Sequence, residues 1–199
     1  MKAAPVMHAL NGRHQVRQSL VHTGQHYDAN MSHAFFSQLE IPAPDVNLEV
    51  GSGSPALKGI LGALLEVSAH LNVVFPVHPR TRERMATLAW NARSLQLLEP
   101  LPYIEFLALQ RRATVVITDS GGIQEETTYL GVPCLTLRKD TDRPVTVNLG
   151  TNVLVGQSQD KLRCELTNIL GGKAKSGVIP PLWDGHAGER IAEILCHAS

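Results

Sequence analysis

Residues 114–137, with the sequence TVVITDSGGIQEETTYLGVPCLTL, contain the pattern that decides the fold. β-Branched residues at 114–118 predict a strand, residues 122–130 predict a helix, and residues 134–137 predict a second strand. The small residues Ser120, Gly121 and Gly122 stand between the first strand and the helix. Two parallel strands need a long crossover connection, which is most often a helix. This stretch therefore predicts a parallel strand–helix–strand unit.

The same alternation extends outward over most of the chain. Further strands are predicted at 72–77, 95–98 and 152–155, and further helices at 57–70, 81–90, 103–110, 159–170 and 187–197. Short apolar strands that alternate with helices are typical of a parallel sheet covered on both faces. The predicted fold class is α/β.

The N-terminal part of the chain is poorer in strands. It contains predicted helices at 3–10 and 30–39 but only one predicted strand, at 19–23. A single strand is too little to form the centre of an independent domain. The segment Gly51-Ser52-Gly53-Ser54-Pro55 is typical of a linker. We therefore expect an incomplete N-terminal domain at 1–54 and a C-terminal domain at 55–199.

Composition excludes several classes of protein. The chain has 199 residues, with 18 basic and 18 acidic side chains, so its formal net charge is zero. This balance gives no reason to expect a nucleic acid or an anionic membrane as partner. No apolar run approaches the roughly 20 residues of a membrane span, and no secretory signal is visible at the start. Three widely spaced cysteines are typical of reduced thiols, which predicts a cytoplasmic protein.

The turn formed by Ser120, Gly121 and Gly122 is a candidate site for an anion. It lies at the carboxyl end of a strand, where α/β proteins usually bind ligands, and it opens a helix. Unpaired N–H groups and the helix dipole favour a phosphate there, and glycines let the ligand approach the backbone. Glu126 lies one turn further along and could accept hydrogen bonds from ligand hydroxyls. The alternative is a tight turn in which Ser120 simply caps the helix.

A second candidate follows the strand at 134–137. The loop Arg138-Lys139-Asp140-Thr141-Asp142-Arg143 brings cations to the same predicted edge and suits a diphosphate, although a solvated charged loop is the alternative. His78 follows another strand at this edge. No spacing of His, Cys, Asp or Glu fits a metal site, and neither G-x-G-x-x-G nor a P-loop is present, so no metal or cofactor is expected.

Three segments closely resemble the non-hydrolysing UDP-N-acetylglucosamine 2-epimerases: TGQHYD at 23–28, TDSGGIQEETTYLG at 118–131 and VPCLTLRKDTDRPVTVNLGTNVLVG at 132–156. The segments KAAP at 2–5, PVHPRT at 76–81 and LEPLPYIEFL at 98–107 are similar to corresponding stretches of that family. The resemblance implies a glycosyltransferase-B-like fold of two Rossmann-like domains with a UDP-sugar between them. It also implies an isomerase that interconverts UDP-GlcNAc and UDP-ManNAc by eliminating and re-adding UDP, in polysaccharide biosynthesis.

The resemblance also assigns roles to residues. Ser120, Gly121 and Gly122 would hold the diphosphate, Glu126 would bind the ribose hydroxyls, and Arg143 would neutralise phosphate charge. Lys2 would face the substrate from the other domain, and a uridine contact is implied for the backbone near 103–106. His78 and Gln25 match residues near the nucleotide sugar or near a second, regulatory sugar-nucleotide site. Members of the family commonly form dimers, so a homodimer is a further expectation.

The chain departs from the family in two places. It begins at the helix that follows the family's first strand, and it passes from the early N-terminal domain into the C-terminal domain between Ser54 and Pro55. The segments that carry the family's catalytic acids and catalytic histidine have no counterpart here, so no catalytic residue is identified. An internally deleted epimerase is thus one expectation. A non-catalytic UDP-sugar binding module and an inactive fragment are the alternatives.

Overall fold

The computed structural model describes residues 3–11, 21–22, 46–47, 64–77, 82, 95–156 and 158–197. The chain divides into two compact units. Unit 1 comprises Met1–Gly53, Pro102–Ile104 and Pro181–Ser199, and unit 2 comprises Ser54–Leu101 and Glu105–Pro180. Unit 1 therefore groups the last helix with the N-terminal segment. The two-domain division at residue 54 drawn from the sequence stays a prediction.

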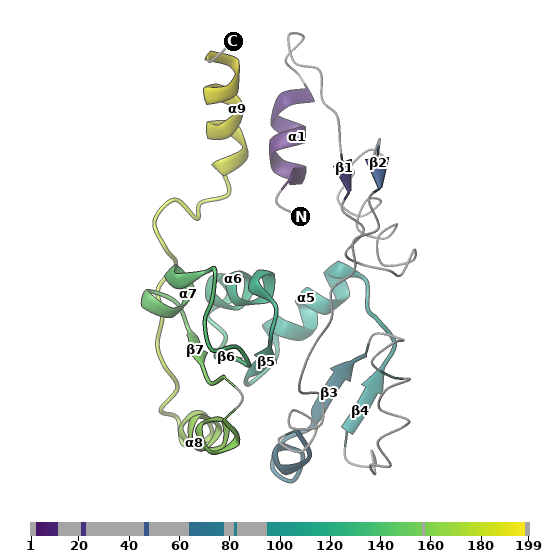
Figure 1. Ribbon diagram of the computed structural model, residues 1–199, viewed down its shortest axis with the longest axis vertical. Helices are drawn as coiled ribbons and strands as arrows, with labels where there is room; N and C mark the ends of the chain where they lie inside the picture. Colours follow the sequence, from purple (N-terminus) through teal and green to yellow (C-terminus); the bar gives the residue numbers. More distant parts are fainter. Residues whose placement is uncertain are drawn as a thin grey trace. The chain divides into compact units, whose positions relative to one another are not determined.

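In the part of unit 1 that the structure describes, two helices pack together and two short strands pair (Figure 1). Helix α1 (Ala3–Asn11) contacts helix α9 (Ala187–His197), and strands β1 (Val21–His22) and β2 (Val46–Asn47) pair in parallel. Gly188 allows the close helix contact, because a Cβ at this position would lie 2.5 Å from the carbonyl oxygen of Pro5. The small side chain of Ala192, one turn further along α9, is fully buried.

The described residues of unit 2 form five strands in two hydrogen-bonded ladders, all parallel (Figure 1). In order along the chain the elements are β3 (Val73–Pro76), β4 (Leu95–Leu98), α5 (Tyr103–Arg111), β5 (Val116–Thr118), α6 (Gly121–Leu130), β6 (Cys134–Thr136), α7 (Pro144–Asn148), β7 (Asn152–Leu154) and α8 (Gln159–Leu170). One ladder pairs β3 with β4, and the other has the order β5-β6-β7. The predicted α/β fold with parallel strands is confirmed.

Helices cover both faces of the β5-β6-β7 ladder, as Figure 1 shows. Leu135 in the middle of β6 packs in one core with Leu162 and Leu166 of α8, which are four residues apart and so lie on one helix face. Alternate residues of a strand point to opposite faces. Accordingly Thr136, next to Leu135, contacts the polar residues under α6 on the other face. The two faces therefore differ in chemistry: one is apolar, and the other is rich in buried hydroxyls and amides.

The structure contains two elements that the sequence pattern did not indicate. Strand β2 has only two residues, which is too short to show alternation. Helix α7 has five residues and begins with Pro144 in its first turn. Proline is common at the first position of a helix, so Pro144 was the available signal. The predicted helix at 30–39 lies outside the described residues, and the predicted helices at 57–70 and 81–90 are described only in part.

Candidate functional site

The turn from β5 into α6 begins the helix without a side-chain cap. Ser120 occupies the N-cap position in an extended conformation, but its side chain makes no capping hydrogen bond. Its own N–H donates to Thr118 Oγ1 at 3.0 Å. In the first turn of a helix the N–H groups lack intrahelical partners. Those of Gly121 and Gly122 are therefore the donors at this end of α6.

Helix α8, unlike α6, begins with a side-chain cap. There Ser158 Oγ accepts the N–H of Lys161 at 3.2 Å, so the side chain of the N-cap residue satisfies one of the free donors. At α6 the corresponding hydroxyl is left over, and Ser120 is exposed. The alternative interpretation from the sequence was that Ser120 caps the helix, but its side chain does not do so in the structure.

Arg143 lies against Gly121 in the first turn of α6. A Cβ on Gly121 would lie 3.7 Å from Arg143 Cγ and 3.9 Å from Arg143 Nε, and only 3.3 Å from Asp142 Oδ1. Arg143 Nε is 3.0 Å from Glu125 Oε1, and Nη1 is 2.8 Å from Asp142 Oδ2. The guanidinium thus lies at the N-terminal end of α6, where the carboxylates of Glu125 and Asp142 pair with it.

The loop before Arg143 is less cationic than its sequence suggests. Arg138 Nη2 lies 4.0 Å from Asp140 Oδ1, and Arg138 Nη1 lies 3.9 Å from Asp142 Oδ1. The charge of Arg138 is therefore partly offset within the loop. Three cations, counting Lys139 and Arg143, and two acids leave residues 138–143 with a net charge of +1. Exposed ion pairs of this kind contribute little stability. Arg143, with 30% of its side chain exposed, is the cation that lies at the helix end.

Glu126 occupies a half-buried position further along α6. Its Oε2 accepts a hydrogen bond from Gln110 Nε2 of α5 at 2.7 Å. Burial raises the pKa of the Glu126 carboxyl, the hydrogen bond from Gln110 opposes that shift, and the charge of Glu125 adds to it. Gln110 itself is 2% exposed. The carboxylate is therefore held in a defined position from which it can accept further hydrogen bonds.

A buried polar network lies beneath this surface, and the sequence did not point to it. Its members are Gln124, Thr136, Thr141, Thr146 and Asn152, and all but Thr141 are fully buried. They come from α6, β6, the loop before α7, α7 and β7. The only hint in the sequence was the number of Thr, Asn and Gln residues in otherwise core-forming segments.

The structure brings together five of the seven predicted site residues. Ser120, Gly121, Gly122, Glu126 and Arg143 all lie in unit 2, on α6 or next to its first turn. The predictions for Lys2 and His78, and for Gln25, fall outside the described residues.

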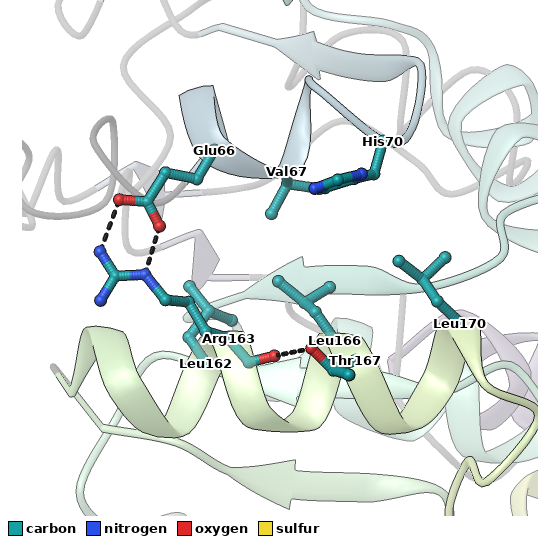
Figure 2. Close-up of a pocket in the computed structure, with 8 residues that line it drawn as sticks. All are labelled: Glu66, Val67, His70, Leu162, Arg163, Leu166, Thr167 and Leu170. Atoms are coloured by element: carbon teal, nitrogen blue, oxygen red, sulfur yellow. Dashed lines mark hydrogen bonds and ion pairs between the residues drawn. The ribbon is translucent and has the colours of Figure 1, made fainter.

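A separate groove lies between residues 64–70 and α8 (Figure 2). It has a volume of about 250 Å³ and is lined by Glu66, Val67, His70, Leu162, Arg163, Leu166, Thr167 and Leu170. Figure 2 shows Glu66 and Arg163 paired across one end, with leucines of α8 forming the floor. None of the predicted site residues lines it. The backbone donors, the cation and the carboxylate described above lie at α6 and not at this groove.

Among the described residues no group of three or more His, Cys, Asp or Glu side chains could hold a metal ion. Within the same part of the chain, no helix is both long and apolar enough to cross a membrane.

The sequence of this chain is similar to known proteins. A sequence model of the family UDP-N-acetylglucosamine 2-epimerase matches residues 8–65 and 52–196. A protein of Methanocaldococcus jannaschii named UDP-N-acetylglucosamine 2-epimerase is 37% identical over 148 residues, 71% of this chain and 40% of that protein. The UDP-2,3-diacetamido-2,3-dideoxy-D-glucuronate 2-epimerase of Pseudomonas aeruginosa is 37% identical over 140 residues, 70% of this chain and 39% of that protein.

The fold is also similar to a solved structure. The crystal structure of the Methanocaldococcus jannaschii UDP-GlcNAc 2-epimerase in complex with UDP-GlcNAc and UDP aligns with a TM-score of 0.83 and 22% identity, over 98% of this chain and 96% of that chain. At this identity the alignment shows the fold alone. The chain spans about 40% of the length of the curated relatives that it matches.

Proposed function

Because the chain belongs to the UDP-N-acetylglucosamine 2-epimerase family, we propose that the N-terminal turn of α6, Arg143 and Glu126 bind the UDP part of a nucleotide sugar. The observation that carries the proposal is the close approach of Arg143 to Gly121, within 3.9 Å of the position that a Cβ would occupy. It puts a guanidinium beside backbone donors whose neighbouring serine does not cap them. Such a combination suits a diphosphate, which can accept hydrogen bonds from both.

The ribose is assigned to Glu126. A carboxylate accepts hydrogen bonds only, and the two hydroxyls of a ribose are donors that can reach one carboxylate together. Gln110 holds one carboxylate oxygen at 2.7 Å, which fixes the group. Glu126 and the first turn of α6 belong to one short helix, so a ligand with a diphosphate next to a ribose can reach both.

The relatives agree on the UDP part of the ligand and differ in its sugar part. The two relatives above are named for different sugars, N-acetylglucosamine and a diacetamido glucuronate, and UDP is the part that both names share. We propose UDP-GlcNAc as the physiological ligand on the strength of the family, with UDP as the recognised part. Lys2, His78 and Gln25 are proposed to contact the nucleotide sugar by the same resemblance.

For the chemistry, we propose that this chain alone does not epimerise the sugar. In the family the reaction removes a proton from the sugar and eliminates UDP, so it needs positioned acids and bases. The segments that carry those groups have no counterpart across the junction of Ser54 and Pro55, where the two family matches overlap at 52–65. The site then acts as a UDP-binding half-site, with an affinity on the order of millimolar.

An amide NMR titration of the full chain with UDP tests the proposal. We expect the signals of Gly121, Gly122 and Glu126 to shift and saturate, while those of the first turn of α8 stay unchanged because Ser158 caps that helix. No shift at α6 up to tens of millimolar UDP, on the scale expected for a half-site, contradicts the proposal.

The variant Gly122→Ala separates binding from folding. A Cβ at position 122 would meet only Ser120 Oγ at 3.9 Å, so the protein has room for it. Alanine is the better helix former, so the free energy of unfolding should stay equal or rise by up to about 1 kcal/mol. The methyl group would stand between the ligand and the N–H donors, and UDP affinity should fall by about tenfold. Urea unfolding and UDP titration of the same sample measure both quantities.

UDP affinity should also depend on the protonation of Glu126. Burial raises the pKa of this carboxyl, so it protonates at a higher pH than an ordinary glutamate as the pH falls. Protonation removes acceptor capacity, and affinity drops. Because the pKa of Glu126 is raised in the folded state, its ionised carboxylate lowers the free energy of unfolding at pH values above that pKa. This destabilisation decreases as the pH falls through the pKa.

The comparison uses Glu126→Gln, titrated with UDP between pH 4 and 8. The ratio of wild-type to variant affinity cancels the titration of the UDP phosphates. It should decrease toward the acid end, and a ratio that stays constant over this range would count against ribose binding by Glu126.

Three further properties are proposed on the basis of the family: a cytoplasmic location, a homodimer, and a place in UDP-ManNAc-dependent polysaccharide biosynthesis. Cys134, Cys164 and Cys196 are free thiols, which is usual in a reducing compartment. Cell fractionation and light scattering of the purified chain test the first two, and a membrane-bound or strictly monomeric protein would oppose them.

A further inference from the structure

Threonine hydroxyls hold the backbone of Arg143 at both of its polar groups. The N–H of Arg143 donates to Thr141 Oγ1 at 3.0 Å, and the carbonyl of Arg143 accepts from Thr146 Oγ1 at 2.8 Å. Arg143 is the N-cap residue of α7 and has an irregular backbone conformation, with φ −125° and ψ 57°. The carbonyl also accepts the backbone N–H of Thr146 at 3.0 Å, so the two hydroxyls and this N–H together hold the backbone from which the Arg143 side chain starts.

Both hydroxyls connect to one side chain, Gln124 of α6. Thr141 Oγ1 donates to Gln124 Oε1 at 2.6 Å. Thr146 Oγ1 receives an N–H from Asn152 Nδ2 at 3.1 Å, and the same Asn152 amide donates to Gln124 Oε1 at 3.0 Å. The carboxamide oxygen of Gln124 therefore connects two hydrogen-bonded paths to Arg143, one through Thr141 and one through Asn152 and Thr146.

The proton directions in this network leave no freedom. The Arg143 carbonyl can only accept, so Thr146 must donate to it and must itself accept from Asn152. The Asn152 oxygen then faces Thr136, whose hydroxyl donates to it at 2.6 Å. Because both neighbours donate to Gln124, its oxygen must face them. Its Nε2 is left without a partner among the described residues.

We propose that Gln124 and Asn152 are positioning residues that fix Arg143 against the first turn of α6. The inference rests on the proposed function of Arg143 as a phosphate ligand. A buried and directionally determined network has few alternative arrangements, because each broken hydrogen bond would leave a desolvated polar group. It couples the helix that supplies the N–H donors to the loop that supplies the cation.

The test measures the affinity of the full chain for UDP and for uridine by amide NMR. Arg143 meets only the phosphates, so a displaced Arg143 lowers the ratio of UDP to uridine affinity, whereas general destabilisation lowers both affinities together. Thr146→Val removes the hydroxyl at nearly constant volume, and Thr146→Ser keeps the hydroxyl. Gln124→Met is the second variant, should Thr146→Val fail to fold.

Thr151→Val is the matched control. Its buried hydroxyl donates to the Val132 carbonyl at 2.6 Å and has no hydrogen bond to the network. Arg143→Ala sets the largest decrease in the ratio that the network can cause.

We expect Thr146→Val and Gln124→Met to lower the ratio about threefold to tenfold, with Thr146→Ser and Thr151→Val near wild type. An unchanged ratio in Thr146→Val and Gln124→Met, while Arg143→Ala lowers it, overturns this inference and leaves the proposed function in place. An unchanged ratio in Arg143→Ala overturns both.

Discussion

Replacement of Glu126 by alanine is expected to lower the affinity of the chain for UDP at least about tenfold, to below detection in a half-site. The carboxylate is the proposed acceptor for two ribose hydroxyls, and hydrogen bonds to a charged group are stronger than neutral ones. The loss should appear in the titration of UDP and equally in that of uridine, because both ligands carry the ribose. That pattern distinguishes Glu126 from Arg143, whose replacement should affect UDP alone.

Glu193→Ala provides a control at an exposed glutamate of α9 and should bind UDP as the wild type does. The substitution at 126 also removes the carboxylate that accepts a hydrogen bond from Gln110, so the free energy of unfolding of the variant has to be measured beside its affinity. If Glu126→Ala stays folded and binds UDP with wild-type affinity, the ribose lies elsewhere.

The second large effect concerns turnover. We expect the chain to produce no UDP-ManNAc from UDP-GlcNAc above background, a loss of several orders of magnitude relative to an intact epimerase. The physical reason is the missing acid–base machinery, since backbone donors and one arginine stabilise charge but move no proton from carbon. The assay is incubation in D2O followed by proton NMR, which detects deuterium at the sugar C2 even without net conversion.

The Methanocaldococcus jannaschii epimerase, which has more than twice the matched length, serves as the positive control. Deuterium incorporation by the purified chain, abolished in Arg143→Ala, would show that this chain supplies its own base and would refute the proposal of a binding half-site.

Several elements could be predicted to within one or two residues from local pattern alone. Strand β4 (Leu95–Leu98) and helix α8 (Gln159–Leu170) begin and end where the hydrophobic period predicts them. Helix α6 ends at Leu130 because Gly131 adopts φ 71°, a left-handed conformation that glycine favours. These are local effects, and a sequence shows local effects directly.

Part of the candidate site could also be predicted from the sequence. Ser120, Gly121 and Gly122 are contiguous, and their place between a strand and a helix follows from the same periodicity. From the residue pattern alone, Arg143 was one cation of a charged loop, and only the family resemblance singled it out as a phosphate ligand. Only the structure shows that Arg143 lies at the first turn of α6, where its side chain is next to Gly121 and Glu125.

What the sequence determined by itself is therefore the order of strands and helices, the parallel fold and the small-residue turn, because each depends on neighbours within about ten positions. Tertiary structure alone decided the network of Gln124, Thr146 and Asn152. Gln124 and Asn152 are 28 residues apart, and nothing in their local sequence shows that they meet. Polar side chains are ordinarily exposed, and these are buried only because folding gives each a hydrogen-bond partner that the chain supplies from a distant segment.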